Sequence, residues 1–287
     1  MRKSMKQFSK IADISEFLNI SRGKGMSVGF VPTMGALHEG HLALVRRSLA
    51  ENNLTVCSIF VNPLQFNNRE DLEKYPRNVT LDTKMLGETG CDAVFIPETP
   101  EIYPENEAPA PVIDFGMLDK VMEGRFRPGH FQGVAIVVRK LFRIVMPDRA
   151  YFGKKDFQQL AIIRYLAGKE KLPVRIVPCE TVREPDGLAM SSRNLRLTIA
   201  ERMLAPRIYQ VLQKVREKAG RMPVRDLKEW AVKKITENPE FRVEYFEIGD
   251  KESLLPVDNW KSRNRAVAFV AVFLGDVRLI DNLELFS

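Results

Sequence analysis

The 287-residue chain has few cysteines, few histidines and no long hydrophobic run. Its three cysteines, Cys57, Cys91 and Cys179, are odd in number and far apart, which argues against a disulfide framework and against a cysteine-rich zinc site. Two of them lie in apolar, strand-like runs, so we expect buried free thiols in a reducing compartment. No stretch approaches the roughly 20 apolar residues of a membrane-spanning helix.

The first residues, Met1–Lys6, are basic, but no apolar signal-peptide core follows them. We therefore expect a cytoplasmic protein that does not bind membranes. The net charge is +7, yet the chain lacks a dense Lys/Arg block and its acidic residues are interspersed. A solvated basic surface explains this charge as well as an anionic substrate or a nucleic acid would. The 45% hydrophobic and 28% charged content is typical of a globular enzyme.

Apolar runs alternate with amphipathic stretches up to about residue 181. This alternation predicts parallel strands joined by crossover helices, and ligands that bind outside the carboxyl ends of the strands. The predicted fold class is α/β: a Rossmann-like parallel sheet with helices on both faces. The expected helices are 6–21, a segment from about Glu39, 78–88, 133–145 and 157–168, and the expected strands are 27–32, 54–61, 92–97, 149–153 and 174–181.

The composition changes near Glu184, where we place the domain boundary, with residues 1–183 as a nucleotide- and substrate-binding domain and 184–287 as a smaller α+β C-terminal domain. Amphipathic helices are predicted at 199–219 and 224–236, and antiparallel strands at 242–248, 265–274 and 277–281. Gly275-Asp276 joins the last two strands as a two-residue hairpin turn. We expect this domain to act as a lid.

The strongest motif begins where the strand that ends at Pro32 turns through Thr33-Met34-Gly35 toward a helix. A strand that turns into a helix presents free backbone N–H groups and the positive end of the helix dipole, and glycines let a phosphate approach. His38 and His41 are three residues apart, so both can project to one side of the helix start. There they can donate hydrogen bonds to phosphate oxygens. A metal pair would need a third ligand, and the only other histidine is His130. We predict nucleotidyl transfer.

Three further segments carry possible anion-binding residues. Gly153-Lys154-Lys155-Asp156 follows a predicted strand; its lysines suit phosphate and its aspartate a ribose hydroxyl or a metal, although Asp156 can equally cap a helix. Met190-Ser191-Ser192-Arg193 predicts a flexible anion-binding loop, or an ordinary polar linker. The segment 124–130, with two arginines, predicts a mobile basic loop.

A His-x-x-His turn followed later by a Met-Ser-Ser-Arg loop is similar to the two-part ATP signature of class I nucleotidyltransferases. Within that group the chain resembles the pantoate–β-alanine ligase (pantothenate synthetase) family over almost its full length. One departure is Leu64, where methionine is expected. The matching segments are Pro32–His41, Phe60–Phe66, Arg127–Phe131, Gly153–Gln159, Asp186–Asn194 and Leu274–Asn282.

The resemblance implies a two-step ligation, with pantoate and ATP bound by the domain 1–183. The carboxylate of pantoate attacks the α-phosphate of ATP to give pantoyl adenylate and pyrophosphate, and the amine of β-alanine then displaces AMP to form pantothenate. It further implies Mg²⁺ with ATP, small-molecule substrates without nucleic acid, and a homodimer. It does not assign metal ligands.

The resemblance also implies site residues. His41 would be a proton donor and His38 would contact the phosphates, with Lys155 and Arg193 as further catalytic residues. Gln65 and Gln159 would bind pantoate, Gln65 also lying near β-alanine. The implied ATP-binding residues are Met34, Gly35, Ala36, Leu37, His38, Glu39, Gly40, His41, Gly153, Lys154, Lys155, Asp156, Val182, Met190, Ser191, Ser192 and Arg193.

Two alternatives share parts of this pattern. A class I aminoacyl-tRNA synthetase has the same two-part signature, and the basic charge fits tRNA. However, the residues after Glu184 make only a small unit, and no zinc-like cysteine cluster or aromatic-rich basic surface is evident. A nucleotidyltransferase that makes a dinucleotide cofactor would lack the Gln65/Gln159 pair.

Overall fold

The computed structural model describes residues 4–108, 110–261 and 263–286, so the basic Met1–Lys3 lies outside the described residues. The chain forms two compact units. The first runs up to Phe115 and includes Arg127–Lys154 and Ile162–Glu180. The second consists of Gly116–Phe126, Lys155–Ala161 and the residues from Thr181 onward. The last junction therefore lies beside the boundary expected at Glu184, but two earlier segments also belong to the second unit.

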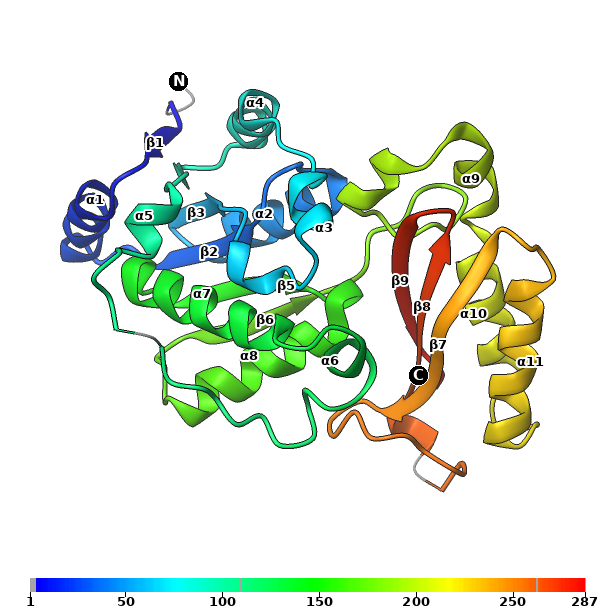
Figure 1. Ribbon diagram of the computed structural model, residues 1–287. Helices are drawn as coiled ribbons and strands as arrows, with labels where there is room; N and C mark the ends of the chain where they lie inside the picture. The colour runs from blue at the N-terminus through cyan, green and yellow to red at the C-terminus, as the bar shows by residue number, and fades with distance from the viewer. Residues whose placement is uncertain (1–3, 109, 262, 287) are drawn as a thin grey trace. The chain divides into compact units, whose positions relative to one another are not determined.

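The first unit contains a six-stranded parallel sheet with the strand order β1-β4-β3-β2-β5-β6 (Figure 1). From β2 the chain builds outward through β3 and β4, then returns to the other side of β2 for β5 and β6. The strand order thus reverses beside β2, and ligands bind at the carboxyl ends of strands at such a point. The strands are β1 (Lys6–Phe8), β2 (Val28–Thr33), β3 (Leu54–Ile59), β4 (Ala93–Phe95), β5 (Arg149–Gly153) and β6 (Arg175–Cys179).

Helices cover both faces of this sheet, as the sequence predicts. Successive strand residues point to opposite faces. Val31 packs in one core cluster with Leu42 and Val45 of α2, whereas the ring of its neighbour Phe30 lies 6.4 Å from that of Phe142 in α7. The helices that surround the sheet are α1 (Ile11–Gly23), α2 (Glu39–Glu51), α3 (Arg69–Glu73), α4 (Val79–Thr89), α5 (Thr99–Ile102), α7 (His130–Val145) and α8 (Phe157–Lys169).

Two predicted helices were wrong in part. The helix expected at 6–21 begins only at Ile11, because Lys6–Phe8 pairs with Ala93–Phe95 as the edge strand β1. The helix expected at 199–219 is two helices, α9 (Ile199–Leu204) and α10 (Arg207–Lys218), which are separated by Ala205-Pro206. Proline lacks the N–H that a continuous helix would need there.

The second unit contains an antiparallel sheet of β7 (Phe241–Asp250), β8 (Ala266–Leu274) and β9 (Val277–Glu284). Leu274 pairs with Val277, which confirms the predicted two-residue hairpin. Alternate residues of β8, such as Ala268 and Val270, pack in one core with α10 and α11 (Val224–Thr236).

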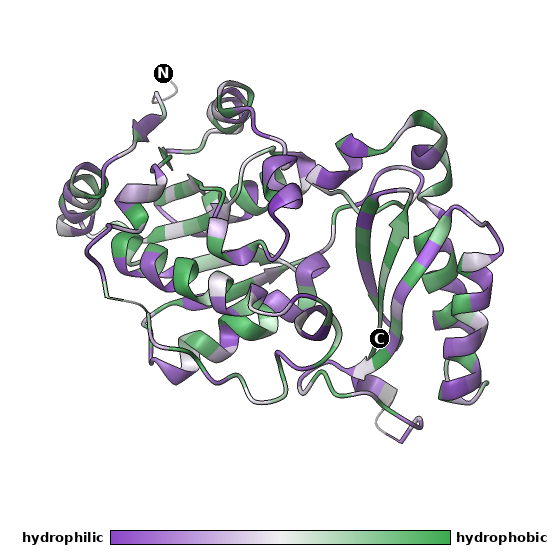
Figure 2. Cartoon of the chain, viewed as in Figure 1, coloured by the Kyte–Doolittle hydropathy of each residue, from purple (hydrophilic) through white to green (hydrophobic). Residues whose placement is uncertain are grey.

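The remaining β8 residues face a second apolar cluster. Val267 and Phe269 pack there with Met122 of α6 (Met122–Phe126) and with Phe157, the first residue of α8. Both faces of β8 are therefore buried, which explains why Figure 2 shows this strand as almost entirely hydrophobic. The segments 116–126 and 155–161, which the predicted boundary placed in the first domain, cover this second face of β8.

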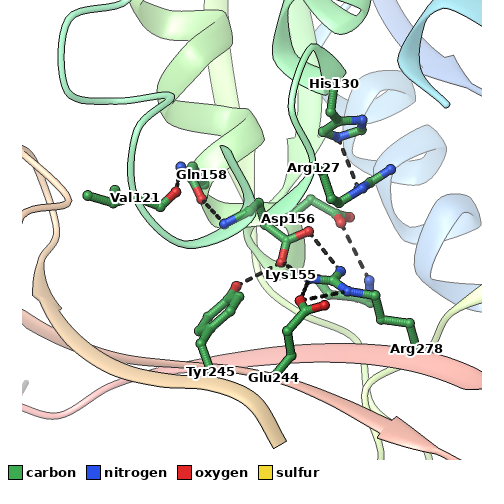
Figure 3. A network of polar contacts seen from close by, with 10 residues as sticks. Val121, Arg127, His130, Lys155, Asp156, Gln158, Glu244, Tyr245 and Arg278 are labelled. Atoms are coloured by element: carbon green, nitrogen blue, oxygen red, sulfur yellow. Dashed lines mark hydrogen bonds and ion pairs between the residues drawn. The ribbon is translucent and has the colours of Figure 1, made fainter. Parts of the chain in front are cut away.

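A charged network accompanies that cluster (Figure 3). Arg278 of β9 donates to Glu123 of α6 at 2.7 and 2.9 Å and to Glu244 of β7. Tyr245 donates to Glu123 at 2.8 Å, and burial, followed by the Glu123 charge, raises the pKa of Tyr245 well above its ordinary value. Gln158 accepts the N–H of Glu123 and donates to the carbonyl oxygen of Val121. Of the segment 124–130, predicted as a mobile basic loop, the first three residues lie in α6 and His130 begins α7.

In the described part of the chain, no helix combines the length and the apolar character needed to cross a membrane.

Candidate active site

The candidate site is built on the residues that link β2 to α2, Met34–His41, which we name the signature turn. Thr33 closes the strand: its Oγ1 donates to the carbonyl oxygen of Ser58 in β3 at 2.7 Å and accepts the N–H of Gly35 at 3.2 Å. Gly35 and Ala36 then adopt left-handed backbone angles, with φ of 81° and 48°. The chain therefore reverses sharply at the carboxyl end of β2.

Two N–H groups of the turn bind a side chain that the sequence did not single out. Asp82 of α4 accepts the N–H of Ala36 at 2.9 Å and that of Leu37 at 2.7 Å. It is only 1% exposed, and this burial raises the pKa of its carboxyl group. A Cβ atom on Gly35 would lie 2.9 Å from its Oδ2 atom. Gly35 therefore leaves the space that the Asp82 carboxylate occupies, and its expected contact with ATP stays a prediction.

The two histidines lie against each other at the start of α2, as their spacing predicts. Their ring centroids are 4.1 Å apart, with 42° between the planes. His38 Nδ1 accepts the N–H of Gly40 at 3.1 Å, and His41 Nδ1 accepts the N–H of His38 at 3.3 Å. Since each Nδ1 is an acceptor, each neutral imidazole carries its proton on Nε2. Both rings can thus donate from Nε2 to an anion.

Gln65 lies beside this turn, because β2 and β3 end at the same edge of the sheet. Asn62 caps a short 3₁₀ turn, Pro63–Gln65, and donates from Nδ2 to Gln65 Oε1 at 3.2 Å. Gln65 Nε2 in turn lies 2.9 Å from the sulfur atom of Met34. Gln65 is 8% exposed, and these two contacts fix which end of its amide is oxygen and which is nitrogen.

Residues distant in sequence hold this arrangement, and sequence analysis missed them. Tyr103 donates to Asn62 Oδ1 at 2.8 Å, while Asn62 Nδ2 donates to the carbonyl oxygen of Gly133 at 3.0 Å. Gly133 lies in α7, and a Cβ atom there would come within 2.6 Å of the Gln65 backbone nitrogen and still closer to the Leu64 carbonyl. Only a residue without a side chain permits this contact between helix and turn.

His130 binds the backbone of Gln65 directly. Its Nδ1 lies 2.7 Å from the Gln65 carbonyl oxygen, and its Nε2 lies 3.1 Å from a guanidinium nitrogen of Arg127 (Figure 3). A guanidinium can only donate, so Nε2 is the acceptor and Nδ1–H donates to the carbonyl. The basic segment thereby contributes a contact to the turn that carries Gln65.

The Gly153–Asp156 segment forms the end of β5 and a 3₁₀ turn, Lys154–Asp156, ahead of α8. Lys154 pairs with Glu180 at 2.6 Å, and Lys155 with Asp156 at 3.5 Å. Gly153 and Lys154 belong to the first unit, and Lys155, Asp156 and Gln159 to the second. Gln159 is half-buried, next to the buried Gln158.

The Met190–Arg193 segment, predicted as a flexible anion-binding loop, makes defined backbone hydrogen bonds. Met190 N–H donates to the carbonyl oxygen of Val182 at 3.0 Å, which brings these two predicted ATP-binding residues together. Ser191 caps a 3₁₀ helix, Ser192–Arg196, by accepting the N–H of Arg193 at 3.3 Å. We name Val182–Arg193 the Ser-Ser-Arg loop; it belongs to the second unit.

A buried ion pair anchors this loop. Arg183 donates to the two carboxylate oxygens of Asp281 in β9, at 2.6 and 3.0 Å, and its guanidinium stacks 3.8 Å from the ring centroid of Tyr209. Burial raises the pKa of Asp281, and the Arg183 contacts oppose that rise. Asn282, which follows it, donates to the carbonyl oxygen of Lys155 at 2.8 Å.

No cluster of three or more His, Cys, Asp or Glu side chains in the described ranges is arranged to hold a metal ion. The three cysteines are free thiols, with Cys57 and Cys91 buried and Cys179 half-buried.

Comparison with known proteins gives one consistent answer. The family model for pantoate-beta-alanine ligase matches residues 6–284. A pantothenate synthetase of Porphyromonas gingivalis is 47% identical over 280 residues, covering 98% of this chain and 99% of that protein. One of Bacteroides fragilis is 49% identical over 280 residues, with the same coverage.

Solved structures agree. The crystal structure of pantothenate synthetase from Thermus thermophilus superposes with a TM-score of 0.92 at 44% identity, covering 99% of this chain and 100% of that one. The Francisella tularensis pantoate-beta-alanine ligase, complexed with beta-gamma ATP and beta-alanine, gives a TM-score of 0.82 at 33% identity, covering 98% of both chains. With a family model matched over nearly its whole length and relatives close to half identical, the chain belongs to the pantoate–β-alanine ligase family.

Proposed function

We propose that this protein joins pantoate to β-alanine in an ATP-dependent reaction that proceeds through pantoyl adenylate and releases AMP and pyrophosphate. The observation that carries the proposal is the edge where β2 and β3 end. There the signature turn carries both the His38/His41 pair and Met34, whose sulfur atom lies 2.9 Å from Gln65 Nε2. The family match of the chain spans residues 6–284.

In the first step a carboxylate oxygen of pantoate attacks the α-phosphorus of ATP. A new P–O bond forms while the bond to the β-phosphate breaks and pyrophosphate leaves. The Nε2–H groups of His38 and His41 stabilise the charge that develops on the phosphates, with His41 as the proton donor. Lys155 and Arg193 add positive charge. Electrostatic stabilisation of this kind supplies much of the acceleration in such reactions.

ATP contacts two sets of residues in this proposal. The first set is the signature turn with Gly153 and Lys154, and the second is Lys155 and Asp156 with Val182 and Met190–Arg193. In the turn, side chains rather than the N–H groups of Ala36 and Leu37 bind phosphate, because Asp82 already accepts those two hydrogen bonds.

Gln65 and Gln159 bind pantoate. An amide is neutral, so it orients the attacking carboxylate without competing as a charge for the phosphate. Gln65 suits this task because Asn62 and Met34 fix its orientation. A side chain held in its bound conformation costs little additional entropy when substrate arrives.

In the second step the amine of β-alanine attacks the acyl carbon of pantoyl adenylate. The C–N bond forms, the bond from carbon to the phosphate oxygen breaks, AMP leaves and the nitrogen loses a proton. Gln65 lies near the amine as well. The Francisella relative, whose structure is complexed with beta-gamma ATP and beta-alanine, supports a site for the amine substrate.

We further propose that Mg²⁺ arrives as a complex with ATP. Magnesium is commonly bound through substrate phosphates and one or two carboxylates, which does not require a dedicated protein cage. Asp156 is exposed beside Lys155 and is the carboxylate of this site that suits the role. The family resemblance also supports a cytoplasmic homodimer.

The lid role of residues 184–287 is likewise a proposal. Exclusion of water would protect the reactive mixed anhydride from hydrolysis. ATP with pantoate should then slow hydrogen exchange in residues 183–195, and Arg193→Ala should largely abolish this protection. Equal exchange with and without substrates contradicts the lid role.

The function is tested by incubating the protein with ATP, Mg²⁺, pantoate and β-alanine, and by omitting each in turn. Amide product and AMP should appear in equal amounts only in the complete mixture. Without β-alanine, labelled pyrophosphate should still exchange into ATP, because the first step is reversible. Stoichiometric ADP in place of AMP would exclude the adenylate intermediate.

A further inference from the structure

One buried carboxylate of the first unit takes no part in the proposed chemistry. Asp82 lies in α4, 46 residues after Ala36 in sequence, and is 1% exposed. The hydrogen bonds of its carboxylate within the described residues come from backbone N–H groups of the signature turn, at 2.7 and 2.9 Å. No lysine, arginine or histidine of the described residues forms an ion pair with it.

The two N–H groups that it accepts form an anion-binding concavity. Gly35 and Ala36 both have positive φ, and in this turn the consecutive N–H groups of Ala36 and Leu37 point at one carboxylate. Concavities of this kind bind phosphates and other anions in many proteins. Here the anion belongs to the protein itself, and the absence of a Cβ atom on Gly35 leaves the space for it.

Each of the two Asp82 carboxylate oxygens accepts one N–H of the turn. Burying a charged group without a cation is costly, and the pKa of Asp82 is raised because burial outweighs its two backbone hydrogen bonds. The bonds are made to the residues that come immediately before His38, the N-cap of α2. The costly group therefore fixes the segment from which both histidines project.

We infer that Asp82 is a positioning residue: its carboxylate acts as a built-in anion that holds Ala36 and Leu37, aims His38 and His41, and keeps phosphate out of the concavity. This inference rests on the proposed function in one respect, since the histidines matter only if they act on ATP.

The test replaces the internal anion by an external one. Asp82→Ala removes the carboxylate and leaves a space beside two N–H groups, into which formate can bind. Pyrophosphate exchange and the melting temperature are measured in sodium formate and in sodium chloride of equal ionic strength. Asp148→Asn is the matched control, because Asp148 accepts the N–H of Val28 at 2.6 Å and so holds the opposite end of the same strand.

We expect Asp82→Ala to lower kcat/KM for ATP about 100-fold, the loss typical of a misplacement of about 1 Å in a catalytic group. Formate should restore activity about 10-fold and raise the melting temperature of this variant. Formate should change neither quantity in the wild type or in Asp148→Asn.

A second variant, Gly35→Ala, displaces the same carboxylate without removing it. The methyl group of Gly35→Ala would meet Asp82 Oδ2 at 2.9 Å and push the carboxylate away. It should reproduce the loss in kcat/KM but not the rescue, because the methyl group blocks formate. If Asp82→Ala yields no folded protein, Asp82→Asn, which keeps the volume, is used for the kinetic comparison.

A kcat/KM within threefold of the wild type in Asp82→Ala or Asp82→Asn overturns the inference. So does a formate-dependent rise in melting temperature without recovered activity, since Asp82 is then a structural anion only. A wild-type chain that forms no adenylate refutes the proposed function instead, and the melting temperature of Asp82→Ala in formate still reports whether the concavity binds a carboxylate.

Discussion

The signature turn and the Ser-Ser-Arg loop are both anchored by a buried aspartate, but they differ in what compensates its charge. Asp82 accepts two backbone N–H groups from the turn. Asp281 receives both ends of the Arg183 guanidinium and one N–H, from Asn282 at 2.8 Å. Burial raises the pKa of both carboxyl groups. The turn is thus held by dipoles and the loop by an ion pair, so disturbing the first should affect mainly the reaction and disturbing the second mainly the stability.

The largest effect expected from this contrast is on the reaction rate. His41→Ala should slow single-turnover adenylate formation on the order of 100-fold or more, because a donor to the transition state is lost. Its affinity for pantoate should change little. Arg47→Ala, on the exposed side of the same helix and paired with Glu51, is the control and should stay within twofold of the wild type. A His41→Ala rate within a few-fold of the wild type contradicts the role of His41.

An intermediate effect is expected on stability. Arg183→Met leaves Asp281 buried without its cation, which typically costs about 3–5 kcal/mol in the free energy of unfolding. The double variant Arg183→Met/Asp281→Asn should recover much of this loss, because no charge then remains buried. Urea unfolding of the wild type and the two variants measures both values. A double variant as unstable as the single one shows that the charge is not the cause.

The smallest effect concerns pH. The pKa of Asp82 is raised from its ordinary value of 3.8, so at pH values just above 3.8 the folded state binds more protons at this group than the unfolded state. The contribution of Asp82 to the free energy of unfolding therefore falls as the pH rises through the raised pKa. Asp82→Asn lacks this titration.

The stability of Asp82→Asn relative to the wild type should consequently increase between about pH 4 and pH 8, whatever its absolute value. Urea unfolding at several pH values gives the difference in the free energy of unfolding between Asp82→Asn and the wild type. The contributions of the other titrating groups cancel in this difference. A difference that decreases with pH contradicts the assignment of the raised pKa to Asp82.

Much of the fold could be predicted because its signals are local. The apolar run at 149–153 follows Pro147, which ends the preceding helix, and the structure places β5 at Arg149–Gly153. The strand Lys6–Phe8 could not be predicted, since three residues carry no clear pattern and its pairing partner is Ala93–Phe95. The role of residues 116–126 and 155–161 in covering β8 likewise depends on contacts distant in sequence.

The candidate site divides in the same way. The proximity of His38 to His41 follows from helical spacing, and that of Met34 to Gln65 follows from parallel strands ending at one edge. Asp82 gave no signal, because an aspartate within a charged, amphipathic helix is usually solvated. Sequence alone also could not identify Asp82 as the acceptor for the N–H groups after Gly35, since it shows that these groups lie outside the helix but not which side chain they bind.

Gly133 shows how far such a site extends into the scaffold. In the interior of a helix, an exchange of glycine for alanine normally gains about 1 kcal/mol. In α7 the added methyl group would instead press on the Leu64–Gln65 backbone. A survey of natural variants would score this exchange as conservative, at a residue that contacts neither nucleotide nor acid in the proposed reaction. The substitution Gly133→Ala would nevertheless impair the active site. A second-site mutation that restores activity is expected in the 62–65 turn rather than in the helix.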